Sequence, residues 1–276
     1  MRSIAIINQK GGVGKTTTAV NLSRALAEQE QRVCLLDLDP QAHATLHLGV
    51  NPTEETPSVY DLLVGQANWD DVLRPVLPTL SVIPSHIDLA AAEIELAGEV
   101  GREMVLRDKL PTNDDDFDFL IIDCPPSLGV LTLNALVAVD EVILPMQPHF
   151  LALHGVSKLL HTIQVVARRL NNKLRLNGVV FCMYDTGTRL AAEVSGDVEE
   201  FLAQAGQEAN SPWSDAKPFQ TRIRRNVRLA EAPSFGQSIF EYAPTSHGAE
   251  DYRELALEVL SDCAETAPEL PRQHVG

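Results

Sequence analysis

Residues 8–17 read NQKGGVGKTT, and this stretch decides the fold through its position between two regular patterns. The β-branched run SIAIIN leads into the glycines and predicts a strand, whereas residues 16–31 have the apolar spacing of a helix. A second buried run, RVCLLDLD at 32–39, follows the helix. The order strand, glycine loop, helix and strand is the beginning of a right-handed parallel βαβ unit.

Buried apolar runs continue to alternate with helical patterns along the chain. Further strands are expected at 80–85, 117–125, 141–148 and 176–184, and helices near 88–110, 128–138, 152–170 and 189–204. This alternation predicts an α/β fold, a doubly wound and mostly parallel sheet flanked by helices. We expect one domain over residues 1–263, a surface loop at 206–218, and a disordered tail at 264–276, which has two prolines and little apolar content.

The composition favours a cytoplasmic protein with a sizeable core. Apolar residues make up 45% of the 276 residues, and the net charge of −16 argues against a polybasic membrane-binding protein. No apolar run reaches the roughly 18 residues that a membrane helix needs. The four cysteines form no C-x-x-C pair, which argues against a zinc site and fits a reducing compartment.

The glycine stretch departs from the phosphate-loop consensus G-x-x-x-x-G-K-[ST] at its first position, where Gln9 replaces glycine, and it carries a second lysine, Lys10. In such a loop the backbone N–H groups turn inward, and the helix N-terminus adds favourable charge for a phosphate. Lys15 would reach the β- and γ-phosphates of a nucleotide, and the Thr16 hydroxyl would ligate Mg²⁺. Thr17 is placed to touch the α-phosphate. The backbone candidates of the loop are Gly11, Gly12, Val13 and Gly14.

Acidic residues end two of the predicted strands. In FLIIDCPPS, Asp123 follows an apolar run and matches the Walker-B acid that lies near the metal. In LLDLDPQ, Asp37 is still inside the strand, where a hydrogen-bonded strand-end acid is expected. Asp39 lies just beyond it and is either the carboxylate that orients an attacking water or a turn acid before Pro40. Thr16, Asp123 and Asp39 are the candidate metal ligands.

Four stretches together resemble one known family. KGGVGKTTTAVNLS, LLDLDPQAHAT, IIDCPPSLGVLTLNAL and RNVRLAEAPSFGQSI are similar to the ParA/Soj branch of the deviant-Walker-A ATPases, over about residues 3–263. The resemblance implies that Lys10 crosses a dimer interface and contacts the phosphates of the partner's ATP. Such lysines would offset the charge of two enclosed nucleotides, and hydrolysis would release the dimer. The candidate catalytic residues are Lys10, Lys15, Asp39 and Asp123.

The basic residues are concentrated in one part of the chain. Residues 158–228 hold eleven Lys and Arg against seven Asp and Glu, so this part carries +4 and the rest carries −20. The resemblance places DNA-contacting arginines at Arg189, Arg222, Arg225 and Arg228, which would bind phosphates without sequence preference. The alternative for each arginine is a solvated helix face or an ion pair with a neighbouring acid.

The same part of the chain contains the expected base contacts. The resemblance implies that Asn226 hydrogen-bonds adenine. Relatives usually have a proline where this chain has Arg224. We expect Arg224 either to stack on adenine or to add to the DNA-binding face.

These features favour an ATPase that partitions DNA. With ATP and Mg²⁺ the chain would form a homodimer on non-specific DNA, and a ParB-like partner would stimulate slow hydrolysis. A chromosome, plasmid or protein cargo would thereby be segregated, in the cytoplasm and on the nucleoid. One alternative is a MinD-like membrane-positioning ATPase, but this needs a basic amphipathic helix and residues 248–265 are acidic. The other is a metabolic ligase of the same fold, which needs a further substrate site.

Overall fold

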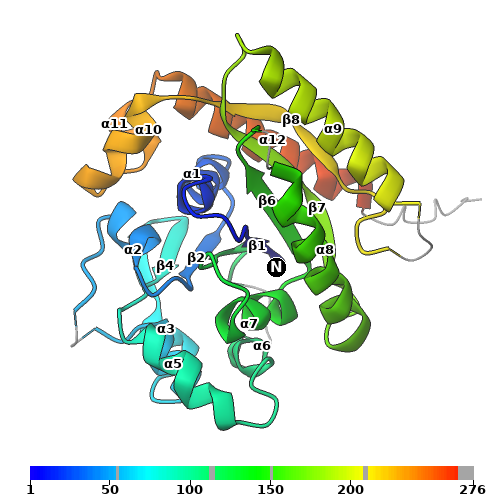
Figure 1. Ribbon diagram of the computed structural model, residues 1–276. Coiled ribbons are helices and arrows are strands. Elements are labelled where there is room, and N and C mark those ends of the chain that lie inside the picture. Colours follow the sequence, from blue (N-terminus) through cyan, green and yellow to red (C-terminus); the bar gives the residue numbers. More distant parts are fainter. Residues whose placement is uncertain (54–55, 112–115, 150–151, 208–210, 267–276) are drawn as a thin grey trace, which may run out of the picture.

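The computed structural model describes residues 1–53, 56–111, 116–149, 152–207 and 211–266 and contains an eight-stranded sheet with helices on both faces (Figure 1). The strand order is β3-β4-β2-β5-β1-β6-β7-β8. All neighbouring strands are parallel except β3 and β4, which are antiparallel. The doubly wound α/β fold expected from the sequence is thereby confirmed. The strands are β1 (Arg2–Ile6), β2 (Val33–Asp37), β3 (Arg74–Leu77), β4 (Leu80–Ile83), β5 (Phe119–Asp123), β6 (Glu141–Met146), β7 (Arg175–Tyr184) and β8 (Lys217–Arg224).

The helices vary from single turns to 20 residues. The helices that lie between successive strands of the chain are α1 (Lys15–Glu28), α2 (His43–His47), α3 (Val59–Val64), α4 (Trp69–Val72), α5 (Leu89–Glu95), α6 (Val105–Lys109), α7 (Val130–Ala138), α8 (Ala152–Arg169) and α9 (Arg189–Ala205). After the last strand come α10 (Val227–Glu231), α11 (Ile239–Tyr242) and α12 (His247–Thr266). The described residues also form two short 3₁₀ helices, η1 (Leu96–Gly98) and η2 (Ala232–Phe235).

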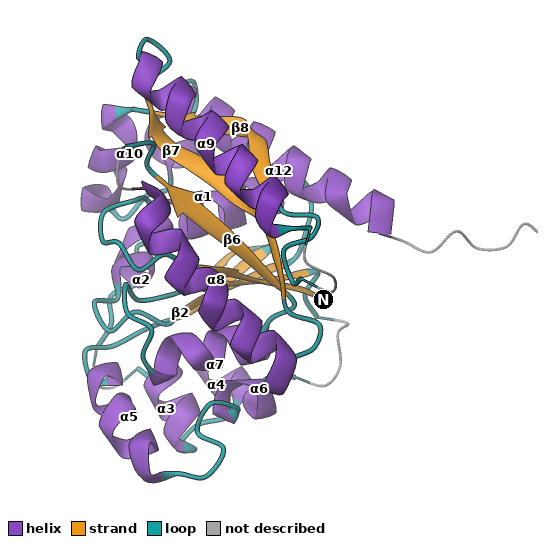
Figure 2. Cartoon of the chain, turned by 45° about the vertical axis from the view of Figure 1, so that its right-hand side comes forward, coloured by secondary structure: helices purple, strands orange, loops and turns teal. Residues whose placement is uncertain are grey.

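Two apolar cores lie on the two faces of the sheet, and the side-chain alternation of β1 supplies both. Ala5 and Ile7 pack into the core beneath α3 to α9, whereas Ile4 and Ile6 pack into the core beneath α1, α11 and α12. Figure 2 shows the strands between these groups of helices. A strand buried on both faces is apolar at most positions, which explains the uninterrupted run Ile4–Ile7 that precedes the glycine loop.

The sequence missed both edge strands, β3 and β8. Pro75 sits in β3, and none of the β3 residues is fully buried, so no continuous apolar run marks this strand. In β8 the buried residues alternate with exposed ones, and basic side chains interrupt the apolar pattern. The helix expected near 88–110 is broken into α5, η1 and α6, because Gly101 adopts a left-handed conformation (φ 77°) between them.

The C-terminal helix α12 continues through Thr266, so it extends into the segment expected to be a tail, and residues 267–276 lie outside the described residues. The surface loop expected at 206–218 is described except for 208–210, and β8 begins at Lys217. In the part of the chain that the structure describes, no helix has both the length and the apolar character needed to span a membrane.

Candidate nucleotide-binding site

The carboxyl ends of three neighbouring strands meet at one edge of the sheet. Ile6 at the end of β1 is in register with Asp123 at the end of β5, and Asp123 is in register with Asp37 at the end of β2. The glycine loop, residues 8–14, leaves β1 at this edge and leads into α1. Parallel strands thus bring the loop and the acids together although they are far apart in the chain.

The loop can close tightly on α1 because of Gly14. This glycine has a left-handed backbone (φ 98°), and a Cβ added to it would lie 3.3 Å from the Cβ and Sγ atoms of Cys182 on β7. Helix α1 starts at the next residue and has no side-chain cap at Gly14, so its first backbone N–H groups are available to an anion.

Lys15 is held inside the loop. Its side chain is largely buried, with 7% exposure of the residue, and its Nζ donates to the backbone oxygen of Lys10 at 3.2 Å. Burial lowers the pKa of Lys15, and the negative charges of Asp123 and Asp39 act in the opposite direction. The ammonium group therefore faces the acids at the strand ends, where a phosphate would be bound.

The surroundings of the Asp123 carboxylate suit the binding of a cation. It is fully buried, and neither carboxylate oxygen has a hydrogen-bond partner among the described residues. Burial raises the pKa of Asp123 well above its usual range; Asp37 adds to this rise, while the nearby Thr16 hydroxyl and the Lys15 ammonium oppose it. An orphaned carboxylate beside a hydroxyl fits Mg²⁺, a hard ion that prefers oxygen ligands and retains several waters.

Within the described residues, the side chains of His, Cys, Asp and Glu do not gather in a cluster of three or more that could hold a metal ion. A magnesium ion at Asp123 would therefore depend on the Thr16 hydroxyl, water and the phosphate oxygens of a nucleotide. This dependence is typical of Mg²⁺ sites, which are rarely built from protein ligands alone.

Asp37 serves the structure of the loop that follows β2. One of its oxygens accepts hydrogen bonds from the backbone N–H of Thr45 at 2.8 Å and from the Thr45 hydroxyl at 2.7 Å. The other accepts from the backbone of Asp39 at 3.2 Å. Burial raises the pKa of Asp37 to about 6, although these hydrogen bonds favour the ionised form. The geometry agrees with the strand-end acid expected from the sequence.

Asp39 makes the hydrogen bond of a turn acid and also lies close to Lys15 and Asp123. Its Oδ1 accepts from the backbone N–H of Gln41 at 2.9 Å, as a turn acid does. Its backbone oxygen accepts from the Ser85 hydroxyl at 2.7 Å, which fixes the turn to the segment after β4. Its charge also acts on Lys15 and Asp123, so the carboxylate lies at the same site as both. A role in orienting water stays a prediction.

Lys10 lies on the rim of the loop and is exposed. Its backbone N–H donates to Asn8 Oδ1 at 3.0 Å, and its Nζ contacts Nε2 of His149, in the loop after β6. A small pocket of about 220 Å³ lies beside this contact and is lined by Asn8, Gln9, Lys10, Val13, Met146, Gln147, His149 and Gly155. Lys10 is therefore outside the cavity that Lys15 lines.

A larger pocket of about 570 Å³ continues from the phosphate loop toward the ends of β7 and β8. Its phosphate-loop end is formed by Gly12, Gly14, Lys15, Thr16 and Thr17, with Cys182 and Tyr252 packed near this end. The other lining residues are His43, Met183, Ile223, Arg224, Arg225, Asn226, Val227, Leu229 and Ala230. Glycines and a lysine at one end and apolar side chains at the other match a nucleotide, which has charged phosphates and a flat base.

Two predicted base contacts, Arg224 and Asn226, do line this pocket. The Oδ1 atom of Asn226 accepts from the backbone N–H of Arg228 at 2.8 Å and caps α10, so its amide nitrogen is the group left to donate to a base. The Arg224 guanidinium forms ion pairs with Glu250 at 2.7 Å and with Asp251. It is therefore held by carboxylates of α12 in place of the stacking or DNA contact considered from the sequence.

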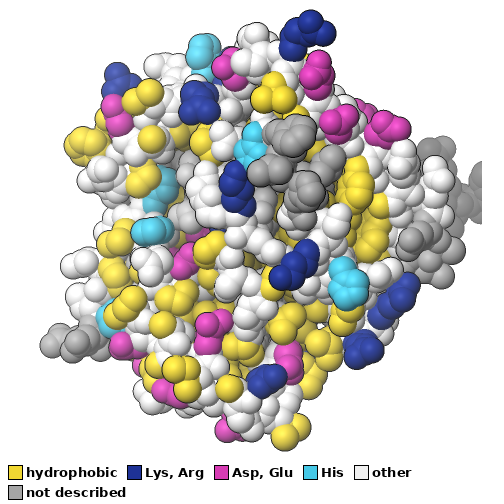
Figure 3. Space-filling view, viewed as in Figure 1, with side chains coloured by type: hydrophobic (Ala, Val, Ile, Leu, Met, Phe, Trp, Pro, Cys, Tyr) yellow, Lys and Arg dark blue, Asp and Glu magenta, His cyan; other side chains and the backbone are white. Residues whose placement is uncertain are grey.

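The four predicted DNA-contacting arginines lie near the same edge of the sheet but differ in their exposure and in their side-chain partners. The Arg189 side chain is 95% exposed and is 3.9 Å from Glu193, whereas Arg228 pairs with Glu231 at 2.7 Å. Arg225 is exposed. Arg222 is half-buried: it lies over the Tyr184 ring at 4.8 Å and donates to the Ser195 hydroxyl. Figure 3 shows Lys and Arg side chains scattered across one face among acidic and apolar ones.

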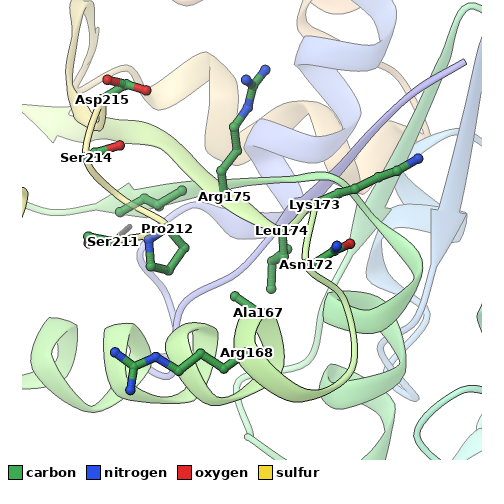
Figure 4. A pocket seen from close by; sticks show the side chains of 11 residues that line it. Ala167, Arg168, Asn172, Lys173, Leu174, Arg175, Ser211, Pro212, Ser214 and Asp215 are labelled. Atoms are coloured by element: carbon green, nitrogen blue, oxygen red, sulfur yellow. The ribbon is translucent and has the colours of Figure 1, made fainter. Parts of the chain in front are cut away.

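A second group of basic residues, Arg168, Lys173 and Arg175, lies at the opposite edge of the sheet. A pocket of about 300 Å³ lies there, between the end of α8, the start of β7 and the loop before β8, and Figure 4 shows the side chains that line it. Arg168, Lys173 and Arg175 line it but point in three different directions, and Arg175 pairs with Glu141 at 3.0 Å. The ten residues of β7 separate these cations from Arg189 by about 30 Å. The segment that carries +4 is therefore divided between two ends of the molecule.

Sequence reasoning missed several residues at the site. His149 contacts Lys10, and His43, Met183 and Tyr252 line the larger pocket. Met183 has a left-handed backbone (φ 51°), which is rare for a residue with a long side chain. The one available signal was position, since His149 and Met183 lie at or just after the carboxyl ends of β6 and β7, where ligands of parallel sheets bind.

The fold and the site define a P-loop nucleotide-binding protein in which one lysine is buried in the loop and a second is exposed at its rim. A family model described as an AAA domain matches residues 1–176. The sporulation initiation inhibitor protein Soj of Bacillus subtilis is 45% identical over 260 residues, which cover 94% of this chain and 98% of that protein. The chromosome partitioning protein ParA of Myxococcus xanthus is 41% identical over 275 residues, covering 99% and 92%.

A solved structure shows the same fold over nearly the whole chain. The cobyrinic acid a,c-diamide synthase of Mycobacterium smegmatis, with a bound ATP analog and magnesium, has a TM-score of 0.80 and 37% identity, and the match covers 97% of both chains. This chain belongs to the ParA/Soj family of chromosome partitioning ATPases. It is an ATPase, and its resemblance to the family, stated from its sequence motifs, is confirmed.

Proposed function

We propose that this chain is a DNA-partitioning switch driven by ATP and Mg²⁺. With ATP bound, two copies form a dimer that binds DNA without sequence preference, and a ParB-like partner stimulates slow hydrolysis and release. The cargo is a chromosome, a plasmid or a protein assembly, and the protein works in the cytoplasm on the nucleoid. The identity of the chain with Soj and ParA over more than nine-tenths of its length supports this proposal.

The observation that carries the proposal is the contrast between two lysines of one loop. Lys15 is buried and faces Asp123 and Asp39, so its charge serves the nucleotide of its own subunit. Lys10 is exposed on the outer rim, where a second subunit could approach. An ATP between two protomers brings several negative charges into the interface, and a cation from each side offsets them.

In ATP hydrolysis the protein contributes mainly by positioning the reacting groups and by stabilising charge. The loop N–H groups and Lys15 would hold the β- and γ-phosphates, and Thr16 and Asp123 would hold Mg²⁺. When bound, the metal supplies positive charge to the phosphate oxygens. Asp39 would orient the attacking water, and Lys10 of the partner subunit would stabilise charge on the phosphates.

A membrane-positioning role is disfavoured by α12. Its apolar face is already packed in the core of the sheet through Ala249, Tyr252, Leu255, Ala256 and Val259. Apart from the buried Asp251, the rest of the helix carries the acids Glu250, Glu254, Glu258, Asp262 and Glu265 against a single Arg253. Anionic lipid would be repelled by this helix.

A metabolic ligase is the second candidate, because the structure with a TM-score of 0.80 is that of a cobyrinic acid a,c-diamide synthase. A ligase needs a second substrate beside the γ-phosphate. The pocket between Lys10 and His149, about 220 Å³, is small for a large organic substrate.

Cosedimentation tests the proposed function against its alternatives. The protein is mixed with random-sequence DNA or with anionic liposomes, each with ATP, ADP or no nucleotide, at low and high salt. We expect binding to DNA with ATP alone, weakening steeply as salt rises. Binding to liposomes would support membrane positioning. Binding to neither would favour the ligase and would contradict the partitioning switch.

A further inference from the structure

An ion pair anchors the wall of the larger pocket to helix α12. The Arg224 backbone N–H donates to Asp251 Oδ2 at 2.8 Å, and its Nε donates to Asp251 Oδ1 at 2.8 Å. A further guanidinium nitrogen reaches Glu250 Oε2 at 2.7 Å. Arg224 is the last residue of β8 and begins the loop of residues 224–227, which lines the pocket.

One partner of this pair, Asp251, is buried, whereas the Arg224 side chain is 34% exposed. Asp251 is 2% exposed, so its carboxylate has little access to water and depends on the groups that Arg224 supplies. A buried carboxylate that loses such a partner leaves an uncompensated charge. Glu250, by contrast, is exposed and adds a solvent-screened second contact.

Two other contacts hold this loop and helix α10, which follows it. The backbone N–H of Arg225 donates to the carbonyl of Tyr184 at 3.1 Å, which ties the loop to the end of β7. On the other side, a Cβ added to Gly248 would lie 2.8 Å from Leu229 Cγ, so the start of α12 packs closely on α10. Figure 1 shows α10 beyond the end of β8, with α12 running beneath that strand.

The next residue of α12 reaches the phosphate side of the site. Tyr252 lines the larger pocket, and its hydroxyl lies 3.1 Å from the hydroxyl of Thr18 in the first turns of α1. Asp251 and Tyr252 are adjacent in sequence, and they connect one helix to the loop at the base end and to α1 at the phosphate end. Helix α12 therefore contacts both ends of the pocket.

We propose that Arg224 is a positioning residue for base recognition: its pair with Asp251 holds residues 224–227 at the distance from the phosphate loop that an adenine nucleotide requires. This role rests on the proposed binding of ATP. It needs no direct contact between the guanidinium and the base, because two carboxylates already hold that group. Base selectivity would then depend on a side chain that does not touch the base.

The test compares Arg224→Ala, Arg224→Lys and Asp251→Asn with the full-length wild type. For Arg224→Ala we expect KM for ATP to rise on the order of tenfold with kcat nearly unchanged, and the preference for ATP over GTP to fall. Inhibition by tripolyphosphate, which engages only the phosphate loop, should stay as in the wild type. Arg224→Lys should be intermediate, and combining Arg224→Ala with Asp251→Asn should add little to the larger single effect.

Arg253→Ala is the matched control, since it breaks an ion pair with Glu28 at 3.1 Å on the same helix. It should leave selectivity unchanged. A folded Arg224→Ala protein with wild-type KM and wild-type selectivity would overturn the role of Arg224. Equal losses for ATP and tripolyphosphate would also overturn it, because they indicate a general loss of structure. If the wild type itself did not distinguish adenine from guanine nucleotides, the proposed function as an ATP-dependent switch would also be contradicted.

Discussion

Lys10 and Lys15 belong to one loop and have opposite surroundings. Lys15 is 7% exposed and is balanced by the charges of Asp123 and Asp39, whereas Lys10 is exposed on the rim. A buried ammonium is stable only beside a negative partner, whereas water can solvate an exposed one. The Lys10 ammonium, which contacts only the neighbouring His149 among the described hydrogen-bond partners, does not depend on a carboxylate of its own subunit. Lys15 suits a nucleotide in the same subunit, and Lys10 suits one that arrives with another subunit.

Substitution of Lys10 separates nucleotide binding from dimer formation. We expect Lys10→Ala to retain measurable ATP binding, because Lys15 and the loop N–H groups are intact, but to lose the dimer that ATP induces. Light scattering after size exclusion, with and without ATP, measures this, and Lys15→Ala is the control that should lose binding itself. A Lys10→Ala protein that still forms dimers with ATP would show that the lysine is only a solvated loop cation.

Asp39 can be tested in the same residue-level way. Removing a water-orienting carboxylate costs roughly 100-fold or more in rate, so Asp39→Ala should bind ATP and dimerise while hydrolysing very little. Phosphate release in single-turnover conditions provides the measurement. Unchanged hydrolysis would leave Asp39 as the turn acid that accepts from Gln41.

At the scale of elements, the short helix α2 is held by buried polar groups. Thr45 donates twice to Asp37, and its hydroxyl also accepts from the backbone of Ser85 at 2.9 Å. His47 closes the same helix, is 1% exposed, and has no hydrogen-bond partner for Nε2 among the described residues. A buried imidazole without a charged partner is stable only in its neutral form.

This burial predicts a pH-dependent stability. Burial lowers the pKa of His47 to about 4, against 6.5 in the unfolded chain. Between pH 6.5 and about pH 4, His47 is therefore protonated in the unfolded chain but neutral in the folded chain. The contribution of His47 to the free energy of unfolding is complete above pH 6.5 and is lost as the pH falls. Between pH 7 and 5 the free energy of unfolding should fall by about 2 kcal/mol more in the wild type than in His47→Gln.

Urea unfolding at both pH values measures that difference, and groups common to the two proteins cancel. In particular, the raised pKa of Asp37 has the opposite effect and is present in both. An equal change of stability in the two proteins would mean that His47 is protonated in the folded chain.

At the scale of the whole molecule, the division of basic charge decides where DNA would bind. Arg189, Arg225 and Arg228 lie at the edge of the sheet that holds the nucleotide pocket, while Arg168 and Lys173 lie at the opposite edge. A dimer formed at the nucleotide edge would place two copies of the first group near one another. Nucleotide binding and DNA affinity would thereby be coupled, since phosphate contacts add up in affinity.

Salt dependence distinguishes the two groups of cations. Each phosphate contact contributes about 0.9 to the slope of log affinity against log salt concentration. Single alanine substitutions at Arg189, Arg225 or Arg228 should therefore make the slope shallower by about 0.9 per lost contact, whereas Arg168→Ala with Lys173→Ala should leave it unchanged. Fluorescence anisotropy with random-sequence DNA in ATP provides both slopes. The reverse pattern would move the DNA contact to the other edge of the sheet. Arg222 is a less clean test, because its loss also removes packing on Tyr184.

Much of the fold and part of the site could be predicted from the sequence. Residues 1–39 contain a buried run, a glycine loop, a helical pattern and a second buried run, and local periodicity is sufficient to assign such elements. The same reasoning placed Lys15, Thr16 and Asp123 together, because the carboxyl ends of parallel strands share one edge. The edge strands β3 and β8 escaped it, since strands that face water on one side lack a continuous apolar run.

By itself, then, the sequence determined the order of the elements, the phosphate loop and the acid at the end of β5, since these depend on residues that are neighbours in the chain. Only the tertiary structure decided that Asp37 bonds to Thr45, that Lys10 contacts His149, and that Arg224 pairs with Asp251. It also decided that ten residues of β7 separate the two groups of cations. The physical reason is packing: these partners are distant in sequence, and local patterns carry no information about which side chains the packed sheet and helices bring together.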